Sequence, residues 1–66
     1  MTIRLNGAPR EVGDGITVAD LVRSLGLEGR PVAVEVNRTL VTRAAHGTTT
    51  LNPDDRVEVV TLVGGG

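Results

Sequence analysis

The residues best suited to chemistry are the last three of the sequence, Gly64, Gly65 and Gly66. The terminal carboxylate of Gly66 is a poor acceptor for a nucleophile because its leaving group would be oxide, whereas an acyl phosphate would supply a good leaving group. Glycine lacks a side chain and tolerates most backbone angles, so such a tail fits a narrow channel in another protein. Three extended residues reach about 10 Å. We interpret Gly64 and Gly65 as providing reach and Gly66 as the reacting group.

An incidental, frayed glycine end is the competing interpretation, and a triglycine without other context favours it. Here the glycines directly follow a predicted strand, residues 56–63, of the expected length, which favours the functional interpretation. Two origins of the Gly66 carboxylate stay open, a natural end and an end exposed by processing. We expect residues 1–63 to form the folded domain and residues 64–66 to form a flexible tail.

The strand before the tail carries a second candidate feature. Val57 and Val59 fit the inward face, which places Glu58, Val60 and Leu62 on the outward face. An apolar pair on a solvent face beside the tail predicts a partner-docking surface made by Val60, Leu62 and Glu58. Two alternatives are that another segment covers the pair, and that single apolar surface residues need no explanation.

Other reactive residue types do not combine into a catalytic or metal site. Asp54 and Asp55 follow Asn52-Pro53 in a predicted turn, where such residues are ordinary turn formers. His46 is the only histidine and the chain has no cysteine, so we interpret it as a solvent-exposed loop residue. Its segment is the one that could cover the apolar pair. We expect no catalytic residue, no metal and no bound cofactor.

The elements that must position the tail can be predicted from periodicity. Thr17 is the expected N-cap of a helix, with Asp20 as its capping-box partner, and Gly26 is the expected left-handed residue after the helix. The apolar stripe that defines this helix recurs at i, i+3, i+4 and i+7, at Val18, Leu21, Val22 and Leu25.

Alternating apolar residues and turn signals predict five strands around this helix, in the order β-β-α-β-β-β. Asn6-Gly7 and Asn37-Arg38 are the expected hairpin turns, and residues 52–55 are the expected type I turn. One helical turn is expected near Ala44-Ala45. The predicted strands cover residues 2–6, 8–12, 32–36, 39–42 and 56–63.

Composition limits the classes of function and partner. The 66 residues contain no Phe, Tyr or Trp, so valine, leucine and isoleucine must fill the core. The formal net charge of −1 gives no reason to expect nucleic acid or an anionic membrane as a partner. A chain without cysteine suits a reducing compartment, and we expect a cytoplasmic protein that is monomeric when free.

This pattern resembles the α+β, ubiquitin-like β-grasp fold, a mixed sheet with one helix packed on one face. More narrowly, it is similar to the sulfur carriers of thiamine biosynthesis, the ThiS family. The likeness covers nearly the whole chain and is carried by residues 17–22, 32–37, 40–41, 54–59 and 63–66.

The resemblance implies a carrier and not an enzyme. In that family, an E1-like adenylyltransferase uses ATP to adenylate the terminal carboxylate, here that of Gly66, and sulfur then replaces one oxygen to give a thiocarboxylate. The thiocarboxylate donates sulfur to a thiazole synthase. The small subunit of molybdopterin synthase and a natural-product sulfur carrier are alternatives with the same fold. A β-grasp binding module with an incidental glycine tail is an alternative of another class.

Overall fold

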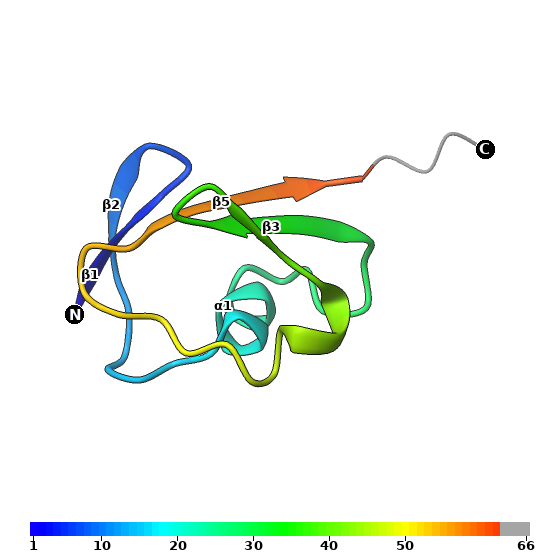
Figure 1. Ribbon diagram of the computed structural model, residues 1–66, viewed down its shortest axis with the longest axis horizontal. Helices are drawn as coiled ribbons and strands as arrows, with labels where there is room; N and C mark the ends of the chain where they lie inside the picture. The colour runs from blue at the N-terminus through cyan, green and yellow to red at the C-terminus, as the bar shows by residue number, and fades with distance from the viewer. Residues whose placement is uncertain (63–66) are drawn as a thin grey trace.

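The computed structural model describes residues 1–62, which form a five-stranded mixed sheet with one α-helix on one face (Figure 1). The strands and helices are β1 (Thr2–Leu5), β2 (Ala8–Glu11), α1 (Val18–Ser24), β3 (Val32–Val36), β4 (Thr39–Val41), the short 3₁₀ helix η1 (Arg43–Ala45) and β5 (Arg56–Thr61). The predicted α+β class and the predicted order of elements are confirmed. None of the helices in the described part of the chain is long and apolar enough to cross a membrane.

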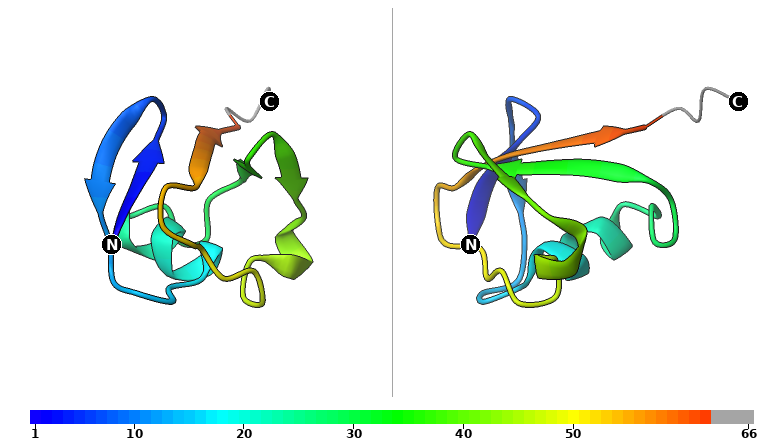
Figure 2. Two further views of the ribbon diagram at one scale, coloured as in Figure 1. Left: turned by 60° about the vertical axis from the view of Figure 1, so that its left-hand side comes forward. Right: turned by 45° about the vertical axis from the view of Figure 1, so that its right-hand side comes forward.

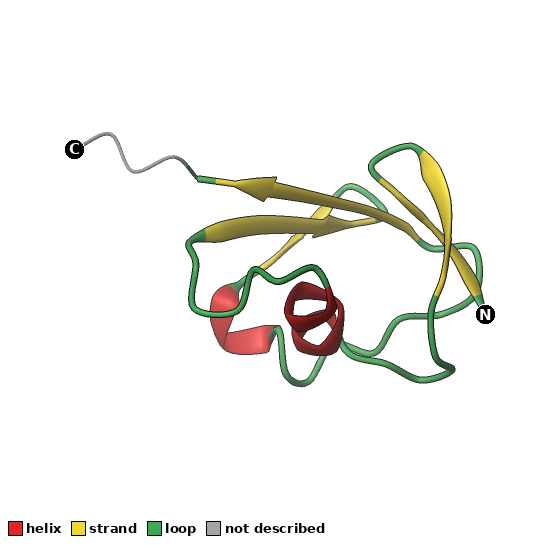
Figure 3. Cartoon of the chain, turned by 180° about the vertical axis from the view of Figure 1, so that it is seen from behind, coloured by secondary structure: helices red, strands yellow, loops and turns green. Residues whose placement is uncertain are grey.

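Strand β5, which leads to the glycine tail, lies in the centre of the sheet. The strand order is β2-β1-β5-β3-β4. Strand β5 pairs in parallel with β1 and antiparallel with β3. Both α1 and η1 lie on the same side of the sheet, as the views in Figures 2 and 3 agree. We call the opposite side the outer face.

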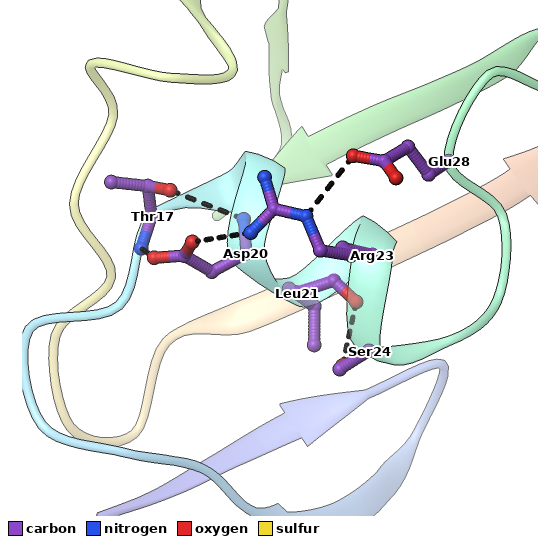
Figure 4. A network of polar contacts seen from close by, with 6 residues as sticks. All are labelled: Thr17, Asp20, Leu21, Arg23, Ser24 and Glu28. Carbon is purple, nitrogen blue, oxygen red and sulfur yellow. Dashed lines mark hydrogen bonds and ion pairs between the residues drawn. The ribbon is translucent and has the colours of Figure 1, made fainter.

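Helix α1 begins at the predicted cap. The Thr17 hydroxyl accepts a hydrogen bond from the Asp20 backbone N–H at 3.1 Å, and the Asp20 carboxylate accepts one from the Thr17 N–H at 3.0 Å (Figure 4). This capping box satisfies two N–H groups that the first turn would otherwise leave unpaired. Gly26, at φ +74°, follows the helix in the left-handed conformation. The cap residues and the glycine stop were therefore predicted correctly.

The core between α1 and the sheet is entirely aliphatic. Its buried members come from the helix stripe, from the inward positions of three strands and from one loop residue, Leu51: they are Ile3, Val18, Leu21, Val22, Val34, Leu51, Val57 and Val59. Leu51 is 1% exposed although it lies in no regular element. Its N–H donates to the Ile16 carbonyl at 2.8 Å, which ties the loop to the start of the helix.

Both two-residue hairpins adopt the left-handed backbone that their position requires. Asn6 and Gly7 have φ of +51° and +84°, and Asn37 and Arg38 have φ of +51° and +69°. Positive φ at both central residues gives a turn whose twist matches that of the flanking strands. Arg38 adopts this conformation at the steric cost of a Cβ atom, which glycine would not have.

The turn at residues 52–55 differs from the predicted type I. Asp54 has φ of +67°, which fits the third position of a type II turn, whereas type I requires a negative φ there. Pro53 at the second position is compatible with both types. The positive φ is fixed by neighbouring contacts, since the Asp54 N–H donates to the Thr2 carbonyl at 2.9 Å and the Asp55 carboxylate accepts from the Asn52 N–H at 2.8 Å.

Strand β5 ends at Thr61, two residues before the predicted end. The Leu62 N–H still donates to the carbonyl of Pro31, the residue before β3, at 2.9 Å. The chain therefore remains bonded to its neighbouring strand as far as Leu62. Val63 and the predicted tail of Gly64, Gly65 and Gly66 lie outside the described residues.

Candidate functional site

The site is built around β5, whose backbone is held by an asparagine side chain where β1 ends. The N–H groups of Arg4 and Asn6 donate to the carbonyls of Asp55 and Val57, both at 2.9 Å. The backbone then turns away from β5 at Asn6, and the carboxamide of Asn6 makes the next hydrogen bonds to β5. Its Oδ1 accepts from the Val59 N–H at 2.8 Å and its Nδ2 donates to the Val59 carbonyl at 3.2 Å. The side chain thus extends the β1 ladder by one step.

The hairpin turn on the other side of β5 makes a related contact. The Asn37 N–H donates to the Arg56 carbonyl at 2.7 Å, and Asn37 Oδ1 accepts from the Arg56 N–H at 3.0 Å. Asn37 Nδ2 also donates to Asp55 Oδ1 at 3.0 Å. Strand β5 is therefore held near its start by Asn37 and in its middle by Asn6.

The predicted docking residues lie on the outer face, as their parity predicted. Val57 is fully buried and Val59 is 8% exposed, whereas Glu58 is exposed, Val60 is 55% exposed and Leu62 is 52% exposed. No segment of residues 1–62 buries the apolar pair. The alternative in which the segment around His46 covers these side chains is therefore wrong.

His46 itself lies on the helix side of the sheet and is half-buried, so its interpretation as a solvent-exposed residue is also wrong. It lines a hollow of about 250 Å³ together with Val22, Arg30 and Arg43. Its ring Nε2 lies 3.3 Å from the Val41 carbonyl oxygen. The Ala19 N–H of α1 donates to the His46 carbonyl at 2.9 Å, so this segment lies against the helix, which its irregular sequence pattern did not indicate.

Arg23 also lines this hollow and is held in place by two acidic side chains. Its Nε donates to Glu28 Oε2 at 3.0 Å and its Nη1 donates to Asp20 Oδ1 at 3.3 Å (Figure 4). The hydrogen bond with Glu28 raises the pKa of the guanidinium. Hydrogen bonds from Thr17, first that of its backbone N–H and then that of its hydroxyl, lower the pKa of Asp20 below its ordinary 3.8. We interpret these groups as stabilising the helix.

One exposed residue of the outer face was missed from the sequence. Leu40 is 61% exposed and lies directly opposite Glu35 in the β3–β4 pairing. The signal was available, since Val41 packs partly against the core and a strand residue next to it must point outward. Leu40, Val60 and Leu62 are the large hydrophobic residues that the described part of the chain exposes.

Charged side chains occupy the other half of the outer face. Arg4, Gly7, Arg56 and Glu58 line a shallow hollow of about 250 Å³. Arg4 Nη2 donates to the Gly7 carbonyl at 3.2 Å. Within residues 1–62, no group of three or more His, Cys, Asp or Glu side chains is arranged to hold a metal ion. The outer face of the described residues therefore combines exposed apolar and charged side chains.

A family model described as the ThiS family matches residues 3–66. The chain belongs to the ThiS family. Two solved structures of one ThiS protein support the assignment. The crystal structure of a thiamine biosynthesis protein (ThiS) from Geobacter metallireducens is 32% identical, covers 100% of both chains and superposes with a TM-score of 0.85. The solution structure of a thiamine biosynthesis protein from the same organism gives a TM-score of 0.82 over 88% of its chain. The predicted ubiquitin-like β-grasp fold is confirmed.

Relatives of this ThiS-family chain include both longer and similarly sized proteins. A thiazole synthase of Magnetococcus marinus is 42% identical over 66 residues, and one of Paramagnetospirillum magneticum is 35% identical. The chain spans 20% of the length of each of these thiazole synthases. An uncharacterised protein of Porphyra purpurea, ycf40, is 32% identical, and the match covers 93% of its length.

Proposed function

We propose that this chain is a sulfur carrier of thiamine biosynthesis that acts through the Gly66 carboxylate and is a substrate of other enzymes. The single observation that carries the proposal is membership of the ThiS family over residues 3–66. The similarity to ThiS of Geobacter metallireducens over the whole chain supports it. Central placement of β5, the strand that leads to the tail, fits a domain that presents its C-terminal residues to a partner.

The proposed chemistry takes place in two steps on the tail. One carboxylate oxygen of Gly66 attacks the α-phosphate of ATP, which releases pyrophosphate and leaves an acyl adenylate. A hydrosulfide ion then attacks the acyl carbon, AMP leaves with the oxygen that had attacked ATP, and loss of the proton leaves the sulfur as a thiocarboxylate. An E1-like adenylyltransferase supplies the active site for the first step. The chain binds no cofactor of its own, and ATP is consumed by the enzyme.

The proposed division of labour is a domain of residues 1–63 and a tail of residues 64–66. Gly64 and Gly65 supply reach because glycine fits a narrow channel. Val60, Leu62 and Glu58 form the docking surface, which the exposure of all three side chains supports. Asn6 and Asn37 hold β5 in the sheet, so the docking residues Glu58 and Val60 are carried on a strand that is bonded on both sides.

A thiazole synthase is the proposed acceptor of the sulfur. The thiazole synthases of Magnetococcus marinus and Paramagnetospirillum magneticum contain a segment that matches all 66 residues of this chain, at 42% and 35% identity. Joining a carrier domain and a synthase in one polypeptide raises their effective concentration, which is advantageous when the two must meet in each cycle. The proposed free form of the carrier is a cytoplasmic monomer.

The test is an activation assay read by mass spectrometry. The chain is incubated with a sulfur-carrier adenylyltransferase, ATP and a sulfur source, treated with iodoacetamide and fragmented. Because the sequence has no cysteine, an alkylated thiol can only come from new chemistry. We expect ATP-dependent alkylation at Gly66, and none in a variant lacking Gly65 and Gly66. Absence of alkylation with several competent adenylyltransferases would refute the proposal.

A further inference from the structure

Two glutamates of the outer face lie directly opposite each other on neighbouring strands. In the β3–β5 pairing, Glu35 is the partner of Glu58. The flanking hydrogen bonds, from Asn37 N–H to the Arg56 carbonyl and from Leu62 N–H to the Pro31 carbonyl, show which positions of this ladder exchange hydrogen bonds. In an antiparallel ladder, every second pair of opposite residues exchanges hydrogen bonds. Glu35 and Glu58 lie two positions from the Asn37–Arg56 pair, so they form a hydrogen-bonded pair, in which the Cα atoms lie about 5.5 Å apart.

Basic side chains lie near this pair without forming ion pairs with it, since Arg4 and Arg56 line a shallow hollow with Glu58. Both side chains are exposed, and no basic group of residues 1–62 forms an ion pair with either carboxylate. Like charges placed directly opposite in an antiparallel pair destabilise the sheet. The free chain therefore carries an unfavourable contact on its outer face.

The outer-face residues on either side of the glutamate pair differ in character along β5. On the side of the tail, the next outer-face row consists of Ala33 opposite Val60. On the side away from the tail, the next outer-face position of β5 is Arg56, which pairs with Arg4 of β1. Along β5 toward the tail, the outer face thus presents a basic row, an acidic row and an apolar row.

We propose that Glu35 and Glu58 together bind one arginine side chain of the thiazole synthase that receives the tail. This inference rests on the proposed function and adds the chemistry of the partner. A planar guanidinium offers five N–H donors and can bridge two carboxylates, and its aliphatic stem can lie on the neighbouring apolar row. When the arginine binds, its positive charge offsets the repulsion between the two carboxylates. The contact between the arginine and the glutamates is therefore favourable in the complex, although the glutamate pair is unfavourable in the free chain.

The order of the rows also fixes the direction of docking. A partner that places its arginine on the acidic row and an apolar side chain on Val60 can do so in one orientation, with its active site beyond Leu62. A reversed partner would bring its arginine to Arg4 and Arg56, and like-charge contacts of this kind exclude wrong orientations. The acidic pair therefore determines the orientation in which the partner docks along β5.

The test uses Glu35→Gln, Glu58→Gln and the double variant, with Glu28→Gln as the matched control. The control removes the same charge from the helix side of the molecule, where Glu28 pairs with Arg23. The dissociation constant for a separately encoded thiazole synthase is measured at low and high salt, and thermal unfolding is measured on the free chain. We expect the double variant to bind about tenfold more weakly at low salt, with the difference shrinking at high salt.

We expect the same double variant to unfold at an equal or higher temperature than the wild type, because the repulsion is gone. Binding within twofold of the wild type would overturn the inference, as would weaker binding to the adenylyltransferase alone. If the wild type forms the thiocarboxylate and binds the synthase, but the glutamine variants bind equally well, only this inference fails. If the wild type neither forms the thiocarboxylate nor binds the synthase, the proposed function fails with it.

Discussion

The carboxamide of Asn6 forms two hydrogen bonds with the backbone of Val59, one accepted at 2.8 Å and one donated at 3.2 Å. The two residues are far apart in sequence, yet the side chain occupies the place that a longer β1 would have taken. The asparagine therefore has two roles, because it also adopts the positive φ of the hairpin turn. The central strand keeps its pairing on both sides while the hairpin is free to turn away.

Replacing Asn6 by glycine is expected to destabilise the domain by about 1–2 kcal/mol, because the partly buried N–H and carbonyl of Val59 lose their partners. Glycine keeps the turn conformation, so the lost carboxamide is the main change. Asn37→Gly is the matched control, since Asn37 has the same φ of +51° but bonds to an exposed backbone group. Thermal unfolding is the measurement, and equal losses in the two variants would contradict this role of Asn6.

Replacing Arg38 by glycine is expected to stabilise the domain by about 0.5–1 kcal/mol. Arg38 lies at φ +69°, where its Cβ atom is unfavourable. Part of the gain is offset because glycine makes the unfolded chain more flexible. For a domain of this size, the expected rise in the unfolding temperature is a few degrees. A lower temperature would indicate that the Arg38 side chain makes a stabilising contact.

Stability is expected to fall in acid partly through Asp20. Its pKa in the folded chain is lowered, first by the hydrogen bond from the Thr17 N–H, so the folded state favours the ionised carboxylate. The contribution is complete above the ordinary pKa of 3.8 and is lost as the pH falls through the lower folded value. Asp20→Asn should therefore destabilise the domain at pH 7 and lose that difference at the lowest pH. Denaturation curves at both pH values check this, and a constant difference would refute it.

Replacing Val60 and Leu62 by serine is expected to weaken docking without unfolding the domain. Both side chains are more than half exposed, so the free energy of unfolding should stay within about 0.5 kcal/mol. Removal of an apolar docking surface should cost about 1 kcal/mol or more of binding free energy, roughly fivefold in the dissociation constant. Binding to the adenylyltransferase or the synthase is the measurement.

Leu40→Ser is the control for that experiment. Leu40 is 61% exposed on the same face, but it lies on β4, which is separated from β5 by β3. Its replacement should weaken binding less than the change on β5. If Leu40→Ser has the larger effect, the docking surface is centred on β4 and not on the strand that leads to the tail.

Elements defined by local chemistry were predictable from the sequence. The Thr17 cap, the left-handed Gly26 and the Asn6-Gly7 turn each depend on one or two residues with strong conformational preferences. The parity of β5 followed from alternation, and it placed Val60 on the outer face. These features need no knowledge of distant parts of the chain.

Features that depend on contacts between distant segments were not predictable in the same way. Pro53 allows two turn types, and the choice was made by bonds that include one from Asp54 to Thr2 across the fold. Burial of Leu51 and the inward position of His46 depend on how residues 43–51 pack beside α1. The facing glutamates required the register of β3 against β5, which the sequence pattern of either strand does not specify.

Parallel pairing of β1 with the central β5 has a mechanical consequence. A force applied beyond Leu62 and resisted at Met1 pulls these neighbouring strands in opposite directions along their length, so their hydrogen bonds are loaded in shear and together. Strands pulled apart from one end would instead lose their bonds one at a time. The domain is therefore built to resist tension along its own C-terminal strand, and a partner that draws that end into a channel pulls against the strongest direction of the sheet.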